Sequence, residues 1–151
     1  MLQRTLLLLL VAMTSSCGTM VYNRAWRAFE PAAENAPMEG RWAGEWRSEW
    51  NGHSGGLRCM LTLEGEDTYL ARFHSTYGWF FFFRHETEFV VTGQQQGTLS
   101  FEGSEDLGSL VGGVYTYAGR VTGDVFEATF AAENGDHGVF SMTRVGDEET
   151  D

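Results

Sequence analysis

The sequence of 151 residues contains no lysine, only two prolines and only two cysteines. Its ten basic residues are therefore all arginine, and they stand against 21 acidic residues, which gives a formal net charge of −11. A surface with this balance repels phosphate backbones and anionic lipid head groups, so we expect neither nucleic-acid binding nor membrane docking through a basic patch. Two cysteines leave no disulfide framework.

The sequence also lacks an apolar run long enough to span a bilayer, which takes about 20 residues. Its longest apolar run, Leu6–Met13, follows Arg4 and precedes the small residues Ser15 and Ser16 and then Cys17. A positive charge, a short apolar run and small residues in this order are typical of a secretory signal. The segment resembles the bacterial lipoprotein type, in which the cysteine after the cut is acylated.

This resemblance implies a signal peptide over residues 1–16, a lipid on Cys17 and residence in the bacterial cell envelope. Membrane attachment would come from that lipid, because the charge of the chain cannot supply it. Thr14 departs from the pattern, which usually has leucine three residues before the cysteine. Ordinary signal cleavage near Ser16, with Cys17 left free, therefore stays open as an alternative.

Removal of residues 1–16 leaves enough chain for one domain. Residues 17–39 contain both prolines and are rich in alanine, as expected of a tether. The aromatic side chains of Tyr22, Trp26 and Phe29 favour a tether that folds back onto the domain, with one helical turn. Residues 40–145 form the predicted domain, and residues 146–151 form an acidic tail that we expect to be solvated and disordered.

From Gly40 onward, apolar residues alternate with polar ones, and Gly, Asn or Asp interrupts the pattern about every ten residues. Eight strands are predicted: Arg41–Trp50, Leu57–Glu64, Tyr69–Ser75, Phe81–Val91, Thr98–Glu102, Val111–Val121, Val125–Ala132 and Val139–Arg144. The alternation gives each strand one buried and one wet face, and short connections pair each strand with its neighbour. An open meander would expose two edges, so the pattern predicts an all-β, antiparallel up-and-down barrel.

The first and last strands carry a possible family signature. Gly40-Arg-Trp42 resembles the G-x-W motif of the calycins, which include lipocalins, fatty-acid-binding proteins and avidins. The resemblance implies that Trp42 plugs one end of the barrel and that Arg144, near the end of the last strand, packs over it as a cation on an indole face. The Thr-Asp-Tyr motif and the C-terminal helix of lipocalins are absent, which argues against a large ligand cavity.

The predicted interior is rich in aromatic side chains, so an eight-strand barrel should be mostly filled. A ligand pocket would then be shallow and would lie at the rim opposite Trp42, with Trp50, Tyr115 and Tyr117 as walls. His85 points inward by parity and joins these candidates. Its simpler interpretation is a core histidine hydrogen-bonded to Thr87 or to a tyrosine.

The same rim gathers residues that could bind a metal. In a meander, alternate loops share one end, which would hold His53, His74, Asp106, Asp136 and His137, with Glu105 beside them. Imidazoles and carboxylates suit zinc or a similar ion if three converge. No spacing forces them together, so solvated loop residues remain the ordinary interpretation.

Two further motifs resemble catalytic ones, but each is better explained by an ordinary structural role. Gly52-His53-Ser54-Gly55-Gly56 matches the G-x-S-x-G nucleophile elbow, but a strand follows it and no helix, so we predict a hairpin loop with positive φ angles at Asn51-Gly52. Cys59 lies on the apolar face of its strand and is predicted to be a buried, inert thiol. We therefore predict no catalytic residue, no cofactor and no enzymatic activity.

The run from Tyr77 to Phe83 is apolar on both faces. One face can fill the barrel, while Phe80 and Phe82 need a cover: the tether, a protein partner or the membrane. We favour the tether. The expected function is the binding of a small apolar or aromatic ligand at the barrel rim, and the alternative is an envelope interaction or structural module that uses the Trp79–Phe82 patch.

Overall fold

The computed structural model describes residues 18–32, 36–78 and 81–146. The predicted signal peptide, Cys17, Trp79 and Phe80 lie outside the described residues, as does the tail after residue 146.

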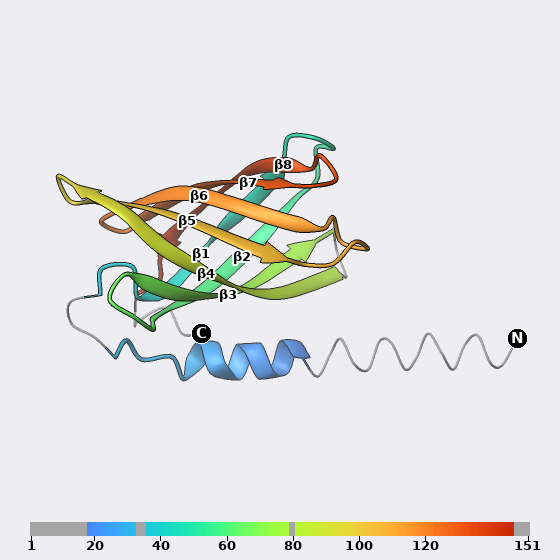
Figure 1. Ribbon diagram of the computed structural model, residues 1–151. Helices are drawn as coiled ribbons and strands as arrows, with labels where there is room; N and C mark the ends of the chain where they lie inside the picture. Colours follow the sequence, from blue (N-terminus) through green and yellow to red (C-terminus); the bar gives the residue numbers. More distant parts are fainter. Residues whose placement is uncertain (1–17, 33–35, 79–80, 147–151) are drawn as a thin grey trace, which may run out of the picture.

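Eight antiparallel strands form a closed barrel in which each strand pairs with its neighbours in sequence and β1 pairs with β8 (Figure 1). The strands are β1 (Gly40–Ser48), β2 (Ser54–Leu63), β3 (Thr68–Tyr77), β4 (Phe81–Gln95), β5 (Thr98–Asp106), β6 (Val114–Thr122), β7 (Val125–Ala132) and β8 (His137–Arg144). The prediction of an all-β up-and-down barrel is confirmed. Alternating apolar residues give the sheet one apolar face, and closing the sheet into a barrel buries that face and leaves no strand edge exposed.

The up-and-down order gives the barrel two different ends. The β1–β2, β3–β4, β5–β6 and β7–β8 loops gather at one end, which we call the open end, and it lies on the right in Figure 1. The β2–β3, β4–β5 and β6–β7 loops and residues 36–39 gather at the other, the closed end.

Aromatic rings fill the middle of the barrel. Phe89, Phe101 and Phe126 are almost fully buried, and the ring centroids of the first two are 4.6 Å apart. Phe126 packs 4.8 Å from Phe101 and 5.6 Å from Trp42. These tilted ring contacts add to the hydrophobic stabilisation that comes from burial.

Glycine at the interior face allows the sheet to bend tightly enough to close. At Gly44 of β1, an added Cβ would collide with the carbonyl oxygen of Ser141 and with the backbone of Met142 on β8. A side chain at this position would force the two strands apart. Glycine kinks of this kind are the usual device for closing small barrels.

The closed end is sealed by Trp42 and Arg144. The guanidinium carbon of Arg144 lies 4.3 Å from the Trp42 ring centroid, and the indole Nε1 donates to the Met38 carbonyl over 2.9 Å. Arg144 also donates to the carbonyls of Glu39 and Pro37, and its Nε pairs with Asp124 at 2.9 Å. The arginine thus ties the segment before β1 to the end of β8.

The described part of the N-terminal helix, residues 18–27, is longer than the one turn expected from the sequence and lies outside the barrel (Figure 1). Tyr22 and Trp26 are one turn apart, so both face the sheet, where they bury Met60 of β2. The guanidinium of Arg58 lies 5.3 Å from each of their ring centroids, and Arg58 donates to Asn23. No helix of the described residues is long and apolar enough to cross a membrane.

Arg58→Ala is expected to loosen this helix. The substitution removes two cation–π contacts at a partly buried site and the bond to Asn23, and should lower the free energy of unfolding by about 1–2 kcal/mol. Urea denaturation measures the loss, and limited proteolysis should show faster cleavage within residues 18–32. Arg24→Ala, an exposed change on the same helix, is the control; equal behaviour of the two variants would contradict the role given to Arg58.

Candidate ligand-binding site

A cavity of about 230 Å³ occupies the open end of the barrel; we call it the open-end cavity. Its lining is mostly aromatic, and the lining residues are Trp46, Leu57, Phe73, Ser75, Tyr77, Phe83, His85, Leu107, Val111, Tyr115, Tyr117, Phe130, Asp136 and Phe140. Its volume is somewhat below the ~300–1,000 Å³ of typical drug-sized sites, which limits a ligand to a small ring system.

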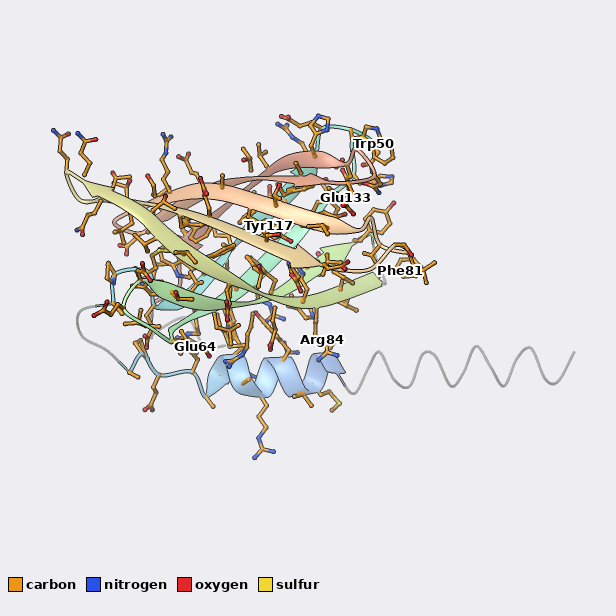
Figure 2. The ribbon with its side chains drawn as sticks, in the orientation of Figure 1. Trp50, Glu64, Phe81, Arg84, Tyr117 and Glu133 are labelled. Atoms are coloured by element: carbon orange, nitrogen blue, oxygen red, sulfur yellow. The ribbon has the colours of Figure 1, made fainter. Side chains whose placement is uncertain are left out.

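Strand alternation positions the walls of the cavity. Phe73, Ser75 and Tyr77 occupy alternate positions of β3, and Tyr115 and Tyr117 occupy alternate positions of β6, so all of them face inward. In Figure 2, Tyr117 lies within the barrel, between its two ends.

Hydrogen bonds hold three of the aromatic wall residues at the mouth. The Trp46 indole donates to the Thr76 carbonyl over 3.0 Å, and its ring stacks on Tyr77 at 6.3 Å. The Tyr77 hydroxyl is 3.0 Å from Nε2 of His53 in the β1–β2 loop. Across the mouth, the Tyr115 hydroxyl donates to the Val111 carbonyl, which fixes the β5–β6 loop above the cavity.

His85 lies in the cavity wall between aromatic rings. Its ring stacks on Phe73 at 4.9 Å and on Tyr117 at 6.4 Å. Burial lowers the pKa of His85 to about 4, so the imidazole is neutral near pH 7. Its Nδ1 is buried and makes no hydrogen bond with the described residues. The predicted bond to Thr87 or a tyrosine is therefore wrong; the Thr87 hydroxyl donates instead to the Ser104 carbonyl.

Glu105 adds a carboxylate beside the cavity. It shares the interior face of β5 with Phe101. Two lining residues are its neighbours, because Leu107 follows it by two positions and Tyr115 of β6 pairs with it. Its Oε2 is buried and has no hydrogen-bond partner among the described residues. Burial is the main reason that the pKa of Glu105 rises to about 7.

The sheet opens next to this carboxylate. The pairing of β4 with β5 runs from Gln95–Thr98 to Phe89–Gly103 and stops there, so residues 81–88 of β4 have no ladder partner on β5 in the described structure. An added Cβ at Gly103 would collide with the Phe89 ring. Glycine there lets Phe89 fill the core just where the two strands part.

Of the four predicted ligand residues, the structure places His85, Tyr115 and Tyr117 in the cavity wall, and Trp50 is not among the lining residues. Trp50 was expected to continue the inward face of β1, but β1 ends at Ser48. The Ser48 hydroxyl accepts bonds from the backbone N–H groups of Trp50 and Asn51, which turns the chain away. The Trp50 side chain is 56% exposed at the open end (Figure 2).

The five candidate metal ligands do not converge. No three His, Cys, Asp or Glu side chains of residues 18–32, 36–78 and 81–146 are placed to hold a metal ion. Asp136 accepts from the Ser48 hydroxyl at 2.6 Å, Asp106 accepts from the Gly108 N–H, and His137 contacts the Gly135 carbonyl. His53 contacts Tyr77 instead. Asp106 and His137 thus contact the backbone of their own turns, and Asp136 and His53 contact side chains of β1 and β3.

His74 was expected at the rim and lies on the outer face of β3. Phe73 points inward, so strand alternation directs His74 outward. Its ring packs 4.9 Å from Tyr22 of the N-terminal helix and 5.4 Å from Phe82. Burial, together with the positive charges of Arg58 and Arg84, lowers its pKa, and neither ring nitrogen has a hydrogen-bond partner among the described residues.

Neither catalytic motif forms catalytic geometry. Ser54 begins strand β2, and Gly52 has the positive φ (76°) that a tight turn requires, whereas Asn51 does not. No strand-to-helix elbow is built around this serine. Cys59 is fully buried in the core, and burial raises the pKa of its thiol.

Large apolar side chains surround the mouth of the cavity. Phe81, Phe82 and Phe83 are 69%, 49% and 37% exposed, and Leu110 and Val111 of the β5–β6 loop are also exposed. Figure 2 shows Phe81 and Trp50 at the same end of the barrel. The tether was expected to cover Phe82, but Tyr22 and Trp26 cover His74 and Met60 and leave Phe82 half exposed.

Sequence reasoning did not assign several wall residues to the site. Trp46 and Phe130 lay within predicted strands and Tyr77 at the start of the apolar run, but none was assigned to the pocket. Val111 was predicted to begin a strand, whereas β6 begins at Val114, and Leu107 was assigned to no element. The β5–β6 connection folds back on itself, with the Leu107 N–H donating to the Gly113 carbonyl. The signal that could have revealed it is the cluster of glycines at 108, 112 and 113, all of which have positive φ.

The chain is therefore an all-β protein whose closed eight-strand barrel holds an aromatic-lined cavity at its open end. A de novo designed fluorescence-activating β-barrel has a TM-score of 0.53 and 16% identity to it, over 78% of this chain and 100% of that chain. The redesigned β-barrel mFAP1, solved bound to DFHBI, has a TM-score of 0.54 and 14% identity, over 71% of this chain and 94% of that chain. Likeness at this identity shows a shared fold alone. The sequence matches no protein-family model and no curated protein.

Proposed function

We propose that this protein is a non-enzymatic binding protein whose barrel holds a small apolar or aromatic ligand in the open-end cavity. The observation that carries the proposal is the cavity itself, about 230 Å³ of space walled by aromatic rings in a barrel whose middle is filled by side chains. Pre-formed apolar cavities with a few polar groups are the usual form of small-molecule sites. The mFAP1 barrel, which shares the fold, was solved with a small molecule bound.

Isothermal titration calorimetry with 2-naphthol, an uncharged fused-ring compound, tests this function. The expected result is saturable 1:1 binding with a negative heat-capacity change, because apolar surface is buried on both partners. Cyclohexanol, which is smaller and not aromatic, should bind more weakly. Absence of binding by 2-naphthol and by other naphthalene compounds would contradict the proposal.

The second candidate function is an interaction module. The exposed Phe81 and Phe82, with Tyr77 beside them, are the described part of the Trp79–Phe82 patch. Exposed apolar side chains that gather at one site often mark a contact surface. Phe81→Ser and Phe82→Ser together should abolish such a contact in a pull-down from envelope extract while leaving 2-naphthol binding within about twofold, since neither residue lines the cavity.

We also propose that the protein is a calycin and that Cys17 carries a lipid. The G-x-W segment and the contact between Trp42 and Arg144 support the former. For the latter, Gly18 follows Cys17 directly, and its carbonyl accepts a 2.9 Å bond from Arg84 of β4. The first described residue after Cys17 is thus held to β4 through the Arg84 side chain, which Figure 2 shows beside the N-terminal helix.

Mass spectrometry of the full chain purified from a bacterial envelope should show an acylated Cys17 at the mature N-terminus. Cys17→Ser should release the protein from the membrane fraction without altering 2-naphthol binding. An unmodified Cys17 in wild-type protein would contradict the anchored location and leave the cavity proposal intact.

A further inference from the structure

We propose that the open-end cavity selects aromatic amines, whose flat ring fills the space and whose protonated nitrogen lies toward Asp136 and Glu105. The inference rests on the ligand-binding function proposed above and specifies the chemical class of the ligand.

The charges around the cavity have one sign. Asp136 is among the lining residues, and Glu105 neighbours two others, Leu107 along the chain and Tyr115 on β6. No arginine is among the described residues that line the cavity. The chain has no lysine that could reach in. A carboxylate ligand would therefore be desolvated without a cation to pair with, whereas an ammonium group would meet opposite charge.

The fields of both carboxylates reach the cavity wall. Burial is the main reason that the pKa of Tyr115 is raised, and the negative charge of Asp136 raises it further. The pKa of Tyr117 is raised in the same way, with burial first and Glu105 second. Both tyrosines line the cavity, so a ligand that touches them lies within range of the two acids.

Glu105 also has an unused hydrogen-bonding oxygen. Its Oε2 is buried and unpartnered among the described residues. Buried polar atoms without a partner are rare, because each costs free energy that a hydrogen bond would recover. A ligand N–H that reaches past Leu107 or Tyr115 would supply the missing donor.

The remaining polar and aromatic groups tolerate a cation. The His85 imidazole is neutral near pH 7, so it does not repel an ammonium group, and its buried Nδ1 offers a second unpartnered atom among the described residues. The faces of Trp46, Tyr77 and Tyr115 add cation–π attraction.

The decisive test compares ligands that share one ring and differ in charge. Isothermal titration calorimetry at pH 8 and about 0.15 M salt should give 1-naphthylmethylamine at least about tenfold tighter than 1-naphthylacetate, with 2-naphthol between them. Equal or tighter binding of the acetate would overturn the inference, although the ligand-binding function would stand. Absence of binding by all three would contradict the function itself.

The pH dependence of binding identifies the carboxylate responsible. The titratable groups around Glu105 are Glu86 on β4 and Tyr115 and Tyr117 on β6. Burial is the main reason that the Glu105 pKa is raised to about 7. Glu105 therefore ionises as the pH rises from 6 to 8, while the alkylammonium group stays protonated. Affinity for the amine should increase severalfold over this range, and affinity for 2-naphthol should stay constant.

Glu105→Gln should remove this rise and weaken amine binding at pH 8, with 2-naphthol binding unchanged. The control is Glu102→Gln, which removes the same charge from the outer, exposed face of the same strand. A Glu102→Gln variant that lost as much amine affinity would show that net charge, rather than Glu105, causes the selectivity. Retention of the pH-dependent rise in Glu105→Gln would also overturn the inference.

Discussion

Trp42→Ala is expected to lower the free energy of unfolding by about 3–5 kcal/mol, the largest loss from any single change considered for this barrel. The indole is fully buried, packs 5.6 Å from Phe126 and lies under the Arg144 guanidinium. Its removal opens a void at the closed end and leaves the Met38 carbonyl without its donor. Urea denaturation followed by far-UV circular dichroism measures the loss.

Trp50→Ala is the matched control for this prediction. Trp50 is exposed, lies beyond the end of β1 and belongs to the opposite end of the barrel. Its truncation should change stability by no more than about 0.5 kcal/mol. If Trp42→Ala cost no more than Trp50→Ala, the closed-end contact would not stabilise the fold.

Ser75→Trp is expected to weaken binding of 2-naphthol by about 100-fold or more. Ser75 lines the cavity between Phe73 and Tyr77, so an indole at this position occupies the space that a ligand would fill. The change gives up the hydrogen bond from the Ser75 hydroxyl to the exposed Phe83 carbonyl, whose loss is small. Calorimetric titration of the variant measures the effect, and its circular dichroism spectrum shows whether the barrel is retained.

Ser100→Trp places the same indole on the outer face of β5, between the inward-facing Leu99 and Phe101. Its affinity for 2-naphthol should match that of the wild type within about twofold. If Ser75→Trp bound 2-naphthol as tightly as Ser100→Trp does, the ligand would not occupy the open-end cavity.

The barrel could be predicted because alternation is a local property of each strand. Phe73, Phe89 and Phe101 face the core as their parity requires, and the predicted strands differ from the observed ones mainly at their ends. The strand ends were harder to predict, because side chains there hydrogen-bond to the backbone and stop the strand. At Ser48, such bonds end β1 two residues early and move Trp50 out of the site.

The cavity could be predicted only in part. Parity placed Tyr115, Tyr117 and His85 on the inner face at the open end, where they line the wall. The burial and hydrogen bonding of the polar side chains depend on how the strands lie in three dimensions, which strand alternation does not predict. Glu105 was expected among rim carboxylates for a metal, yet its Oε2 is buried and unpartnered, and no group of metal ligands forms among the described residues.

The predicted position of His74 at the rim was wrong. Sequence position near the end of β3 suggested the rim, whereas strand alternation sends the side chain outward to Tyr22. Residues 17–39 were expected to fold back onto the domain with one helical turn, but the place where this helix packs could not be predicted, because its contact with Met60 and Arg58 joins segments more than 30 residues apart. Weakly patterned segments such as residues 18–27 take their structure from the surface on which they pack.

The central claim, that a small aromatic ligand occupies the open-end cavity, is tested most directly by an NMR titration of the tryptophan indole N–H signals with 2-naphthol. Trp46 lines the cavity, Trp42 lies at the closed end, and Trp26 and Trp50 lie outside the barrel interior. Binding in the cavity predicts a saturable shift of the Trp46 signal, while those of Trp42, Trp26 and Trp50 move little. Saturable shifts at Trp50 or Trp26 with a stationary Trp46 signal would contradict it.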